Sequence, residues 1–121
     1  MPTITETLLK VLKDLERIGD IEASAVVSTD GLLIAASVPE GTHAETFAAM
    51  SATMLGAAET ATAELRRGVP DRVIVETKKG KLITVGAGPK ALLVVMTSPE
   101  AGLGLTLIEM ERAADKIKGL L

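Results

Sequence analysis

Few side chains in this sequence are of the types that carry out acid–base, nucleophilic or metal chemistry. The chain has no cysteine and a single histidine, His43, which excludes thiolate chemistry and multi-histidine metal sites. A Ser–His nucleophile would depend on His43 alone, and no nucleophile motif accompanies it. The carboxylates of Asp14 and Glu16, and those of Glu109 and Glu111, are two positions apart and would point away from each other on a helix. We therefore predict that the protein is not an enzyme and holds no cofactor or metal.

Two Gly-x-Gly segments remain as candidates for binding a small anion. Gly86-Ala87-Gly88 is followed by Pro89 and an apolar run, whereas a dinucleotide site needs its glycines at the start of a helix. We expect a hairpin turn there. Gly102-Leu103-Gly104 does precede a helical pattern, but it lacks the Lys-Ser/Thr pair of a nucleotide-binding P-loop. A loop-to-helix junction is expected there, and the protein is not expected to bind a nucleotide itself.

Composition narrows the class of partner. The 121 residues carry a net charge of −3, and Phe47 is the only aromatic side chain. Binding to nucleic acid needs a basic patch and stacking aromatics, and the basic turn Lys78-Lys79-Gly80-Lys81 is too short to supply a patch. The longest uncharged run, residues 46–58, is shorter than the roughly 18–20 residues of a membrane span. We expect one soluble, cytoplasmic domain over residues 1–121 that neither binds nucleic acid nor inserts into a membrane.

The spacing of apolar residues predicts the elements that must position any site. Intervals of three and four predict helices over residues 3–18, 42–67 and about 103–118. Alternation and turn residues predict strands over 22–28, 32–37, 71–77, 82–87 and 91–97. Short turns such as Asp30-Gly31 make neighbouring strands antiparallel, with the apolar strand 91–97 in mid-sheet and the charged strand 71–77 at an edge. The predicted fold class is α+β: a five-stranded antiparallel sheet, order αββαβββα, with helices on both faces.

Helix-end signals support these boundaries. Thr3 and Thr42 each stand three positions before a glutamate, which is the spacing of a capping box at a helix start. Gly19 is expected to end the first helix, and Gly68 is expected to end the long one.

The long helix is apolar on almost every side. One side, expected to face the core, carries Phe47, Met54, Leu55, Ala58 and Leu65. The opposite side consists of small and apolar residues rather than charged ones: Ala49, Ala52, Gly56, Thr60 and Ala63, with Met50, Thr53 and Ala57 beside them. A helix that is apolar all round is normally buried all round, which predicts that a second chain covers the outer side. The alternative is that alanine serves here as an ordinary surface residue of a helix.

Three segments carry the most specific pattern of the chain: AVVSTDGLLIAAS (25–37), AETFAAMSATMLGAAETATAEL (44–65) and GLGLTLIEMERAADKI (102–117). In order and spacing they resemble the roadblock family, which comprises the roadblock-type dynein light chains and their prokaryotic relatives. The resemblance implies a profilin- and longin-like fold with the long helix on one face of the sheet and the other two on the opposite face. It also implies a homodimer in which the long helix and the following strand each meet their twin. The implied interface residues are Ala49, Met50, Ala52, Thr53, Gly56, Ala57, Thr60, Ala63, Val73, Ile74 and Val75.

The same resemblance implies a partner. Prokaryotic members look like activators or scaffolds of Ras-like GTPases, so the implied function is a homodimeric, non-catalytic regulator or scaffold that binds a Ras-like small GTPase and modulates its nucleotide cycle. Glu59, Arg66 and Arg67 are the candidate contacts. Arg66, Arg67 and Arg72 qualify as arginine fingers by position only, and arranging the GTPase's own switch residues is an equal route. The alternatives are a small-molecule sensor of the same fold and a scaffold for a motor complex.

Overall fold

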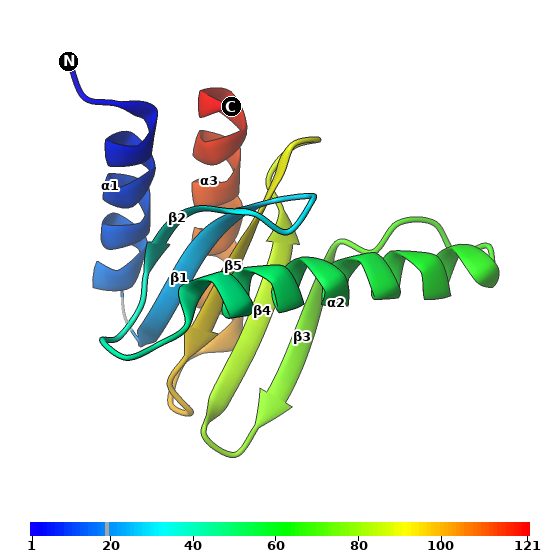
Figure 1. Cartoon of the computed structure of the whole chain (residues 1–121). Helices are drawn as coiled ribbons and strands as arrows, with labels where there is room; N and C mark the ends of the chain where they lie inside the picture. Colours follow the sequence, from blue (N-terminus) through cyan, green and yellow to red (C-terminus); the bar gives the residue numbers. More distant parts are fainter. Residues whose placement is uncertain (19) are drawn as a thin grey trace.

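A computed structural model describes residues 1–18 and 20–121 of the chain. Figure 1 shows helix α1 (Ile4–Arg17), strands β1 (Ile21–Ser28) and β2 (Leu33–Ser37), helix α2 (Ala44–Glu64), strands β3 (Arg72–Thr77), β4 (Gly80–Gly86) and β5 (Ala91–Thr97), and helix α3 (Leu103–Leu120). The strands form one antiparallel sheet in the order β2-β1-β5-β4-β3. The predicted fold class and element order are confirmed, and so are the central place of β5 and the edge place of β3.

Helices cover both faces of the sheet, and each face has its own core. On one face, Leu8 and Leu12 of α1 and Met110 and Ile117 of α3 are fully buried against the strands. On the other face, Ala48 of α2 is buried in a smaller cluster over β1 and β5. This division places one long helix opposite two shorter ones, as predicted (Figure 1). Among the helices that the structure describes, none has the length and apolarity needed to cross a membrane.

The start of α1 follows its sequence signals. The Thr3 hydroxyl accepts a hydrogen bond from the Glu6 backbone N–H at 3.1 Å, so the predicted cap is confirmed. The predicted apolar stripe is buried in its middle, whereas Ile4 and Ile18 at its two ends are exposed. The predicted helix stop, Gly19, lies outside the described residues.

Both predicted ends of α2 need correction. The helix begins at Ala44 after His43, so the predicted capping box between Thr42 and Glu45 is wrong. The backbone N–H of Thr42 instead donates to the carbonyl of Pro39 at 3.2 Å, which places Thr42 in the turn before the helix.

At its other end, α2 stops at Glu64 rather than near Gly68. Arg66 has a φ of +57°, a left-handed conformation that breaks the helix before the expected glycine is reached. The chain then returns toward β3, and the Arg67 backbone N–H donates to the carbonyl of Thr62 at 2.9 Å.

Two turns depend on glycine. Gly31, in the β1–β2 turn, has a φ of +89°, as the Asp-Gly pair predicts. Gly80 has a φ of +144°, and a Cβ at this position would collide with the backbone carbonyl oxygen of Thr97. Because Gly80 pairs with Thr77 across a two-residue turn, β4 begins two residues before the predicted Leu82.

Candidate protein–protein interface

The C-terminal half of α2 extends beyond the sheet. At 1.5 Å per residue its 21 residues span about 31 Å, whereas five strands at their usual spacing span about 19 Å. Leu55 is the last α2 side chain that packs on the core cluster beneath the helix. Figure 1 shows the remaining turns running past β3, and most side chains between Gly56 and Glu64 are exposed. This half of the helix therefore presents a surface that its own chain leaves uncovered.

One side of α2, the alanine flank, is bounded by its own chain; it consists of Ala49, Ala52, Gly56, Thr60 and Ala63. In the first half of the helix, the β1–β2 turn lies against it. A Cβ placed on Gly31 would be 3.6 Å from the Ala49 Cα and 3.9 Å from the Ala52 Cβ. Ala52 also packs on the core cluster under α2. The prediction that Ala49 and Ala52 lie on the outer side is therefore wrong.

The second half of the alanine flank faces the returning segment 66–70. Thr60 and Ala63 line a hollow of about 560 Å³ together with residues of that segment. The Thr62 hydroxyl donates to the Gly68 carbonyl at 2.9 Å, which ties the segment to the helix. Figure 1 shows the segment running back alongside α2. The alanine flank thus lies against its own chain in the first half of the helix, whereas Gly56, Thr60 and Ala63 are exposed, and a Cβ on Gly56 would meet nothing within 4 Å.

A second side of α2, the Met flank, is exposed at Met50, Ala61 and Leu65 and half-buried at its other positions. It consists of residues spaced by three or four, which places them along one side of a helix: Phe47, Met50, Met54, Ala58, Ala61 and Leu65. Met50 is 58% exposed and Leu65 is 73% exposed. Phe47 and Leu55 contact the core cluster as predicted, but the prediction of a core position for Leu65 is wrong, because the helix has left the sheet by that point. The spacing of apolar residues predicted core positions for Phe47, Met54, Ala58 and Leu65 of this flank, and it placed Met50 beside the opposite, outer side.

An apolar hollow lies at the start of the Met flank. It has a volume of about 390 Å³ and is lined by Glu22, Ala23, Pro39, Thr42, Phe47 and Met96. The side chains around this end of α2 are acidic, since Glu22, Glu40 and Glu45 are all exposed.

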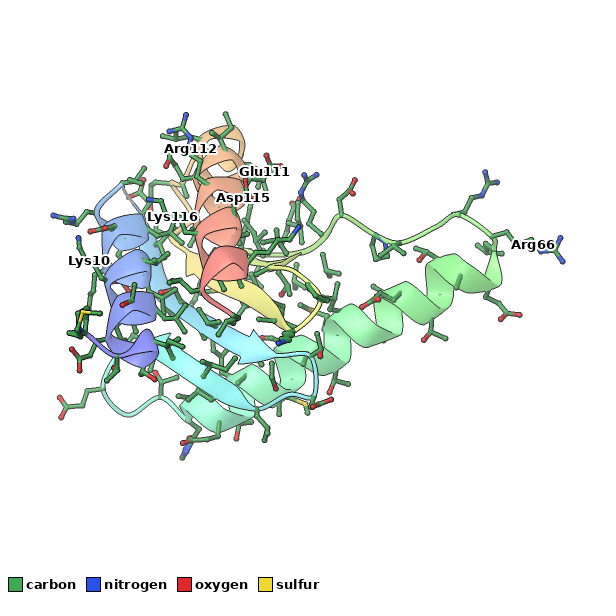
Figure 2. The ribbon with its side chains drawn as sticks, turned by 90° about the horizontal axis from the view of Figure 1, so that it is seen from above. Lys10, Arg66, Glu111, Arg112, Asp115 and Lys116 are labelled. Carbon is green, nitrogen blue, oxygen red and sulfur yellow. The ribbon has the colours of Figure 1, made fainter. Side chains whose placement is uncertain are left out.

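The opposite end of α2 is basic. Arg66 and Arg67 are exposed there, and Figure 2 shows Arg66 projecting from the end of the helix, away from the rest of the molecule. The two ends of α2 therefore carry opposite charge.

Strand β3 forms the neighbouring part of the surface. It pairs with β4 and is an edge of the described sheet. Val75, on the side of the sheet that α2 covers, is 38% exposed, whereas Ile74 packs on the core beneath α1 and α3. Val73 is half-buried. Of the predicted strand residues, Val73 and Val75 lie on the face of the sheet that α2 covers. The Ile74 side chain packs on the opposite face, so only its backbone is available to a partner at this surface.

The charged candidates differ in their surroundings. Glu59 lines a hollow of about 250 Å³ beside Val69 and Pro70, where α2 begins to extend beyond the sheet. Arg72 donates to Glu111 at 3.2 Å and so ties β3 to α3, which makes it a structural ion pair within the chain. The structure places Glu59 near the returning segment 66–70, whereas Arg66 and Arg67 lie just past the C-terminal end of α2.

One carboxylate has a shifted pKa. The guanidinium of Arg17, followed by the ammonium of Lys10, holds the pKa of Asp14 below its usual range through hydrogen bonds to the carboxylate. These groups lie on the exposed side of α1 and stabilise that helix locally. They belong to the opposite face of the sheet from α2.

The geometry defines a class of protein: a profilin-like α+β domain whose long helix extends beyond its own sheet. The structure of profilin II from Acanthamoeba castellanii is similar, with a TM-score of 0.66 and 22% identity, over 90% of this chain and 94% of that one. Residues 7–97 match the family model described as the Roadblock/LC7 domain, and the chain belongs to this family.

A sequence relative and a solved structure agree with this membership. An uncharacterized protein from Methanocaldococcus jannaschii is 41% identical over 111 residues, which covers 92% of this chain and 96% of the relative. The gliding protein mglB from Thermus thermophilus is 19% identical with a TM-score of 0.89, over 99% of this chain and 92% of that one. At that identity the second likeness establishes the fold.

Proposed function

We propose that the protein is a homodimeric, non-catalytic regulator or scaffold that binds a Ras-like small GTPase in the cytoplasm and modulates its nucleotide cycle. The observation that carries the proposal is the half of α2 that extends beyond its own sheet, with exposed apolar side chains, in a chain of the Roadblock/LC7 family. Exposed apolar surface of this kind marks a site of protein association.

In the proposed dimer, α2 lies antiparallel to its twin and β3 pairs with its twin at the open edge of the sheet. The candidate residues remain Met50, Thr53, Gly56, Ala57, Thr60, Ala63, Val73, Ile74 and Val75, with Ala49 and Ala52 held against the β1–β2 turn of their own chain. Pairing two edge strands satisfies backbone groups that an isolated edge leaves to water.

The GTPase is proposed to dock on the outward side of the paired helices. Thr53 and Thr60 are exposed there, and their hydroxyls donate to the carbonyls of Ala49 and Gly56 at 2.8 and 3.1 Å. Because these hydroxyl groups already donate their protons within the helix, they cannot donate to a partner. Thr53 and Thr60 therefore form a small, flat and weakly polar surface. Glu59, Arg66 and Arg67 are the proposed charged contacts at its rim.

Nucleotide turnover tests this function. GTP hydrolysis and nucleotide release by the Ras-like proteins of the source cell are measured with and without stoichiometric amounts of this protein. We expect a stable complex and a changed rate for one of them. Absence of binding to every Ras-like protein of that cell would remove the proposal.

A further inference from the structure

We propose that the apolar hollow at the start of α2 binds a short segment of another protein, in which one large apolar residue has lysine or arginine on one side of it. The apolar side chain enters the hollow, and the basic side chains pair with glutamates at its rim. None of the residues that line the hollow is among the candidate dimer residues or the proposed GTPase contacts. The site is therefore separate from both proposed interfaces.

The lining of the hollow suits a single apolar side chain. Most of it is apolar and comes from four parts of the chain: Ala23 of β1, Met96 of β5, Phe47 of α2 and Pro39 of the loop before α2. Its volume of about 390 Å³ is near the lower end of the range for binding pockets, about 300–1,000 Å³. An apolar anchor in a small pocket with a polar rim is the usual core of a peptide-binding site.

Acidic side chains lie around the hollow. Glu22 lines it directly, Glu40 follows the lining residue Pro39, and Glu45 is in the first turn of α2. All three glutamates are exposed, and none of them forms an ion pair with another described residue. A segment with basic side chains would complement this rim, whereas nucleic acid or an acidic segment would be repelled by it.

A basic turn beside the hollow gives the bound segment a direction. A Cβ placed on Gly80 would be 3.2 Å from the Met96 Cε, so the turn between β3 and β4 lies next to Met96. That turn carries Lys78 and Lys79, which are both exposed. The basic residues of the segment are therefore expected on the side of Glu22, away from β4.

Selection from a library of random peptides displayed on phage tests the site, with the full chain as the target. We expect the enriched peptides to contain one large apolar residue with lysine or arginine on one side of it. Enrichment of peptides without basic residues would overturn the proposal, and so would a selection that enriches no peptide.

Two substitutions test whether a selected peptide binds at this hollow. Ala23→Leu fills the hollow and should weaken peptide binding roughly tenfold or more, since the apolar anchor is excluded. Glu22→Lys replaces attraction by repulsion and should weaken binding by roughly fivefold to tenfold. Circular dichroism verifies folding, and Glu22→Lys alone decides the outcome if Ala23→Leu does not fold.

Asp115→Lys is the matched control for the change of charge. Asp115 is an exposed carboxylate of α3, on the opposite face of the sheet, and it forms no ion pair with another described residue (Figure 2). We expect peptide binding to be unchanged in this variant. Equal weakening by Asp115→Lys and Glu22→Lys would overturn the proposal, because the effect would then come from the net charge of the protein.

The remaining outcomes separate this site from the proposed function. Sedimentation and GTPase binding are measured on Ala23→Leu and Glu22→Lys, and both should be unchanged. Weaker dimerisation of these variants would indicate that a second copy fills the hollow, and unchanged peptide binding would place the peptide elsewhere; either result overturns the proposal. Absence of GTPase binding by the natural protein removes the proposed function, whereas loss of peptide binding in Glu22→Lys still supports this site.

Discussion

Arg66 has a backbone conformation that favours glycine. Replacing it with glycine should raise the free energy of unfolding and, at the same time, weaken association with a partner. Its φ of +57° lies in the left-handed region, where an L-residue with a Cβ is disfavoured by roughly 1–2 kcal/mol. Part of that gain is lost to the greater freedom of glycine in the unfolded chain. We therefore expect Arg66→Gly to raise the free energy of unfolding by about 0.5–1 kcal/mol, equivalent to a rise in Tm of about 2–5 °C for a chain of this size.

The same substitution should weaken the proposed complex with the GTPase, since it removes the guanidinium of a proposed charged contact. Urea unfolding is measured over a range of protein concentrations, because dimerisation itself stabilises the folded chain, and GTPase binding is measured on the same preparations. The expected combination is a higher unfolding free energy extrapolated to the single chain together with a larger dissociation constant for the GTPase.

Asp20 provides the matched control. It has a φ of +61° and lies before β1, so Asp20→Gly relieves a similar conformation away from α2. It should stabilise the chain by less, since aspartate tolerates this region better than arginine, and leave GTPase binding unchanged. If Arg66→Gly lowered the stability of the single chain, the reasoning from backbone conformation would be refuted. If it left GTPase binding unchanged, Arg66 would have no place in that contact.

Three further outcomes are expected. Gly80→Ala should destabilise the fold by about 2 kcal/mol or more, seen as a lower urea midpoint, because its Cβ would meet the Thr97 carbonyl; an unchanged midpoint would contradict this. Asp14→Asn should lower stability slightly at neutral pH. Since Arg17 lowers the pKa of Asp14 in the folded state, that difference should vanish as the pH falls through the lowered pKa, below about 4, and a difference that persisted in acid would refute the ion pair. Glu59→Arg, at a proposed charged contact that is not one of the dimer residues, should block GTPase binding in a pull-down while sedimentation still shows a dimer; retained binding would place the docking surface elsewhere.

Local sequence signals predicted the fold well where one element decides its own structure. The three–four spacing in α1 and the apolar run of β5 correspond to elements that are buried as expected, and the Asp-Gly pair forms the expected turn. The ends of α2 were predicted less well. Thr42 has the right spacing for a cap, but its backbone is engaged by the preceding turn, and Arg66 adopts the conformation that the sequence pattern assigned to Gly68.

The candidate interface shows what the spacing of apolar residues in the sequence cannot predict. Angular spacing distinguished two sides of α2, but it could not tell which positions would be covered by distant parts of the same chain. The turn at Gly31 covers Ala49 and Ala52, and it reaches α2 through tertiary folding. Nor could spacing show that Leu65 lies past the sheet, because the width of the sheet depends on strand order rather than on any local pattern.

The excess length of α2 over the width of its sheet has a dynamic consequence. In a lone chain the turns beyond Gly56 have few buried contacts, so they open at a small free-energy cost, while β5 opens only with the whole domain. Amide hydrogens in these two places therefore exchange with solvent at independent rates. The exchange rate of the amides beyond Gly56 is expected to fall as the protein concentration rises, whereas the exchange rate in β5 stays the same. Exchange at the end of α2 therefore measures the fraction of the protein that is monomeric.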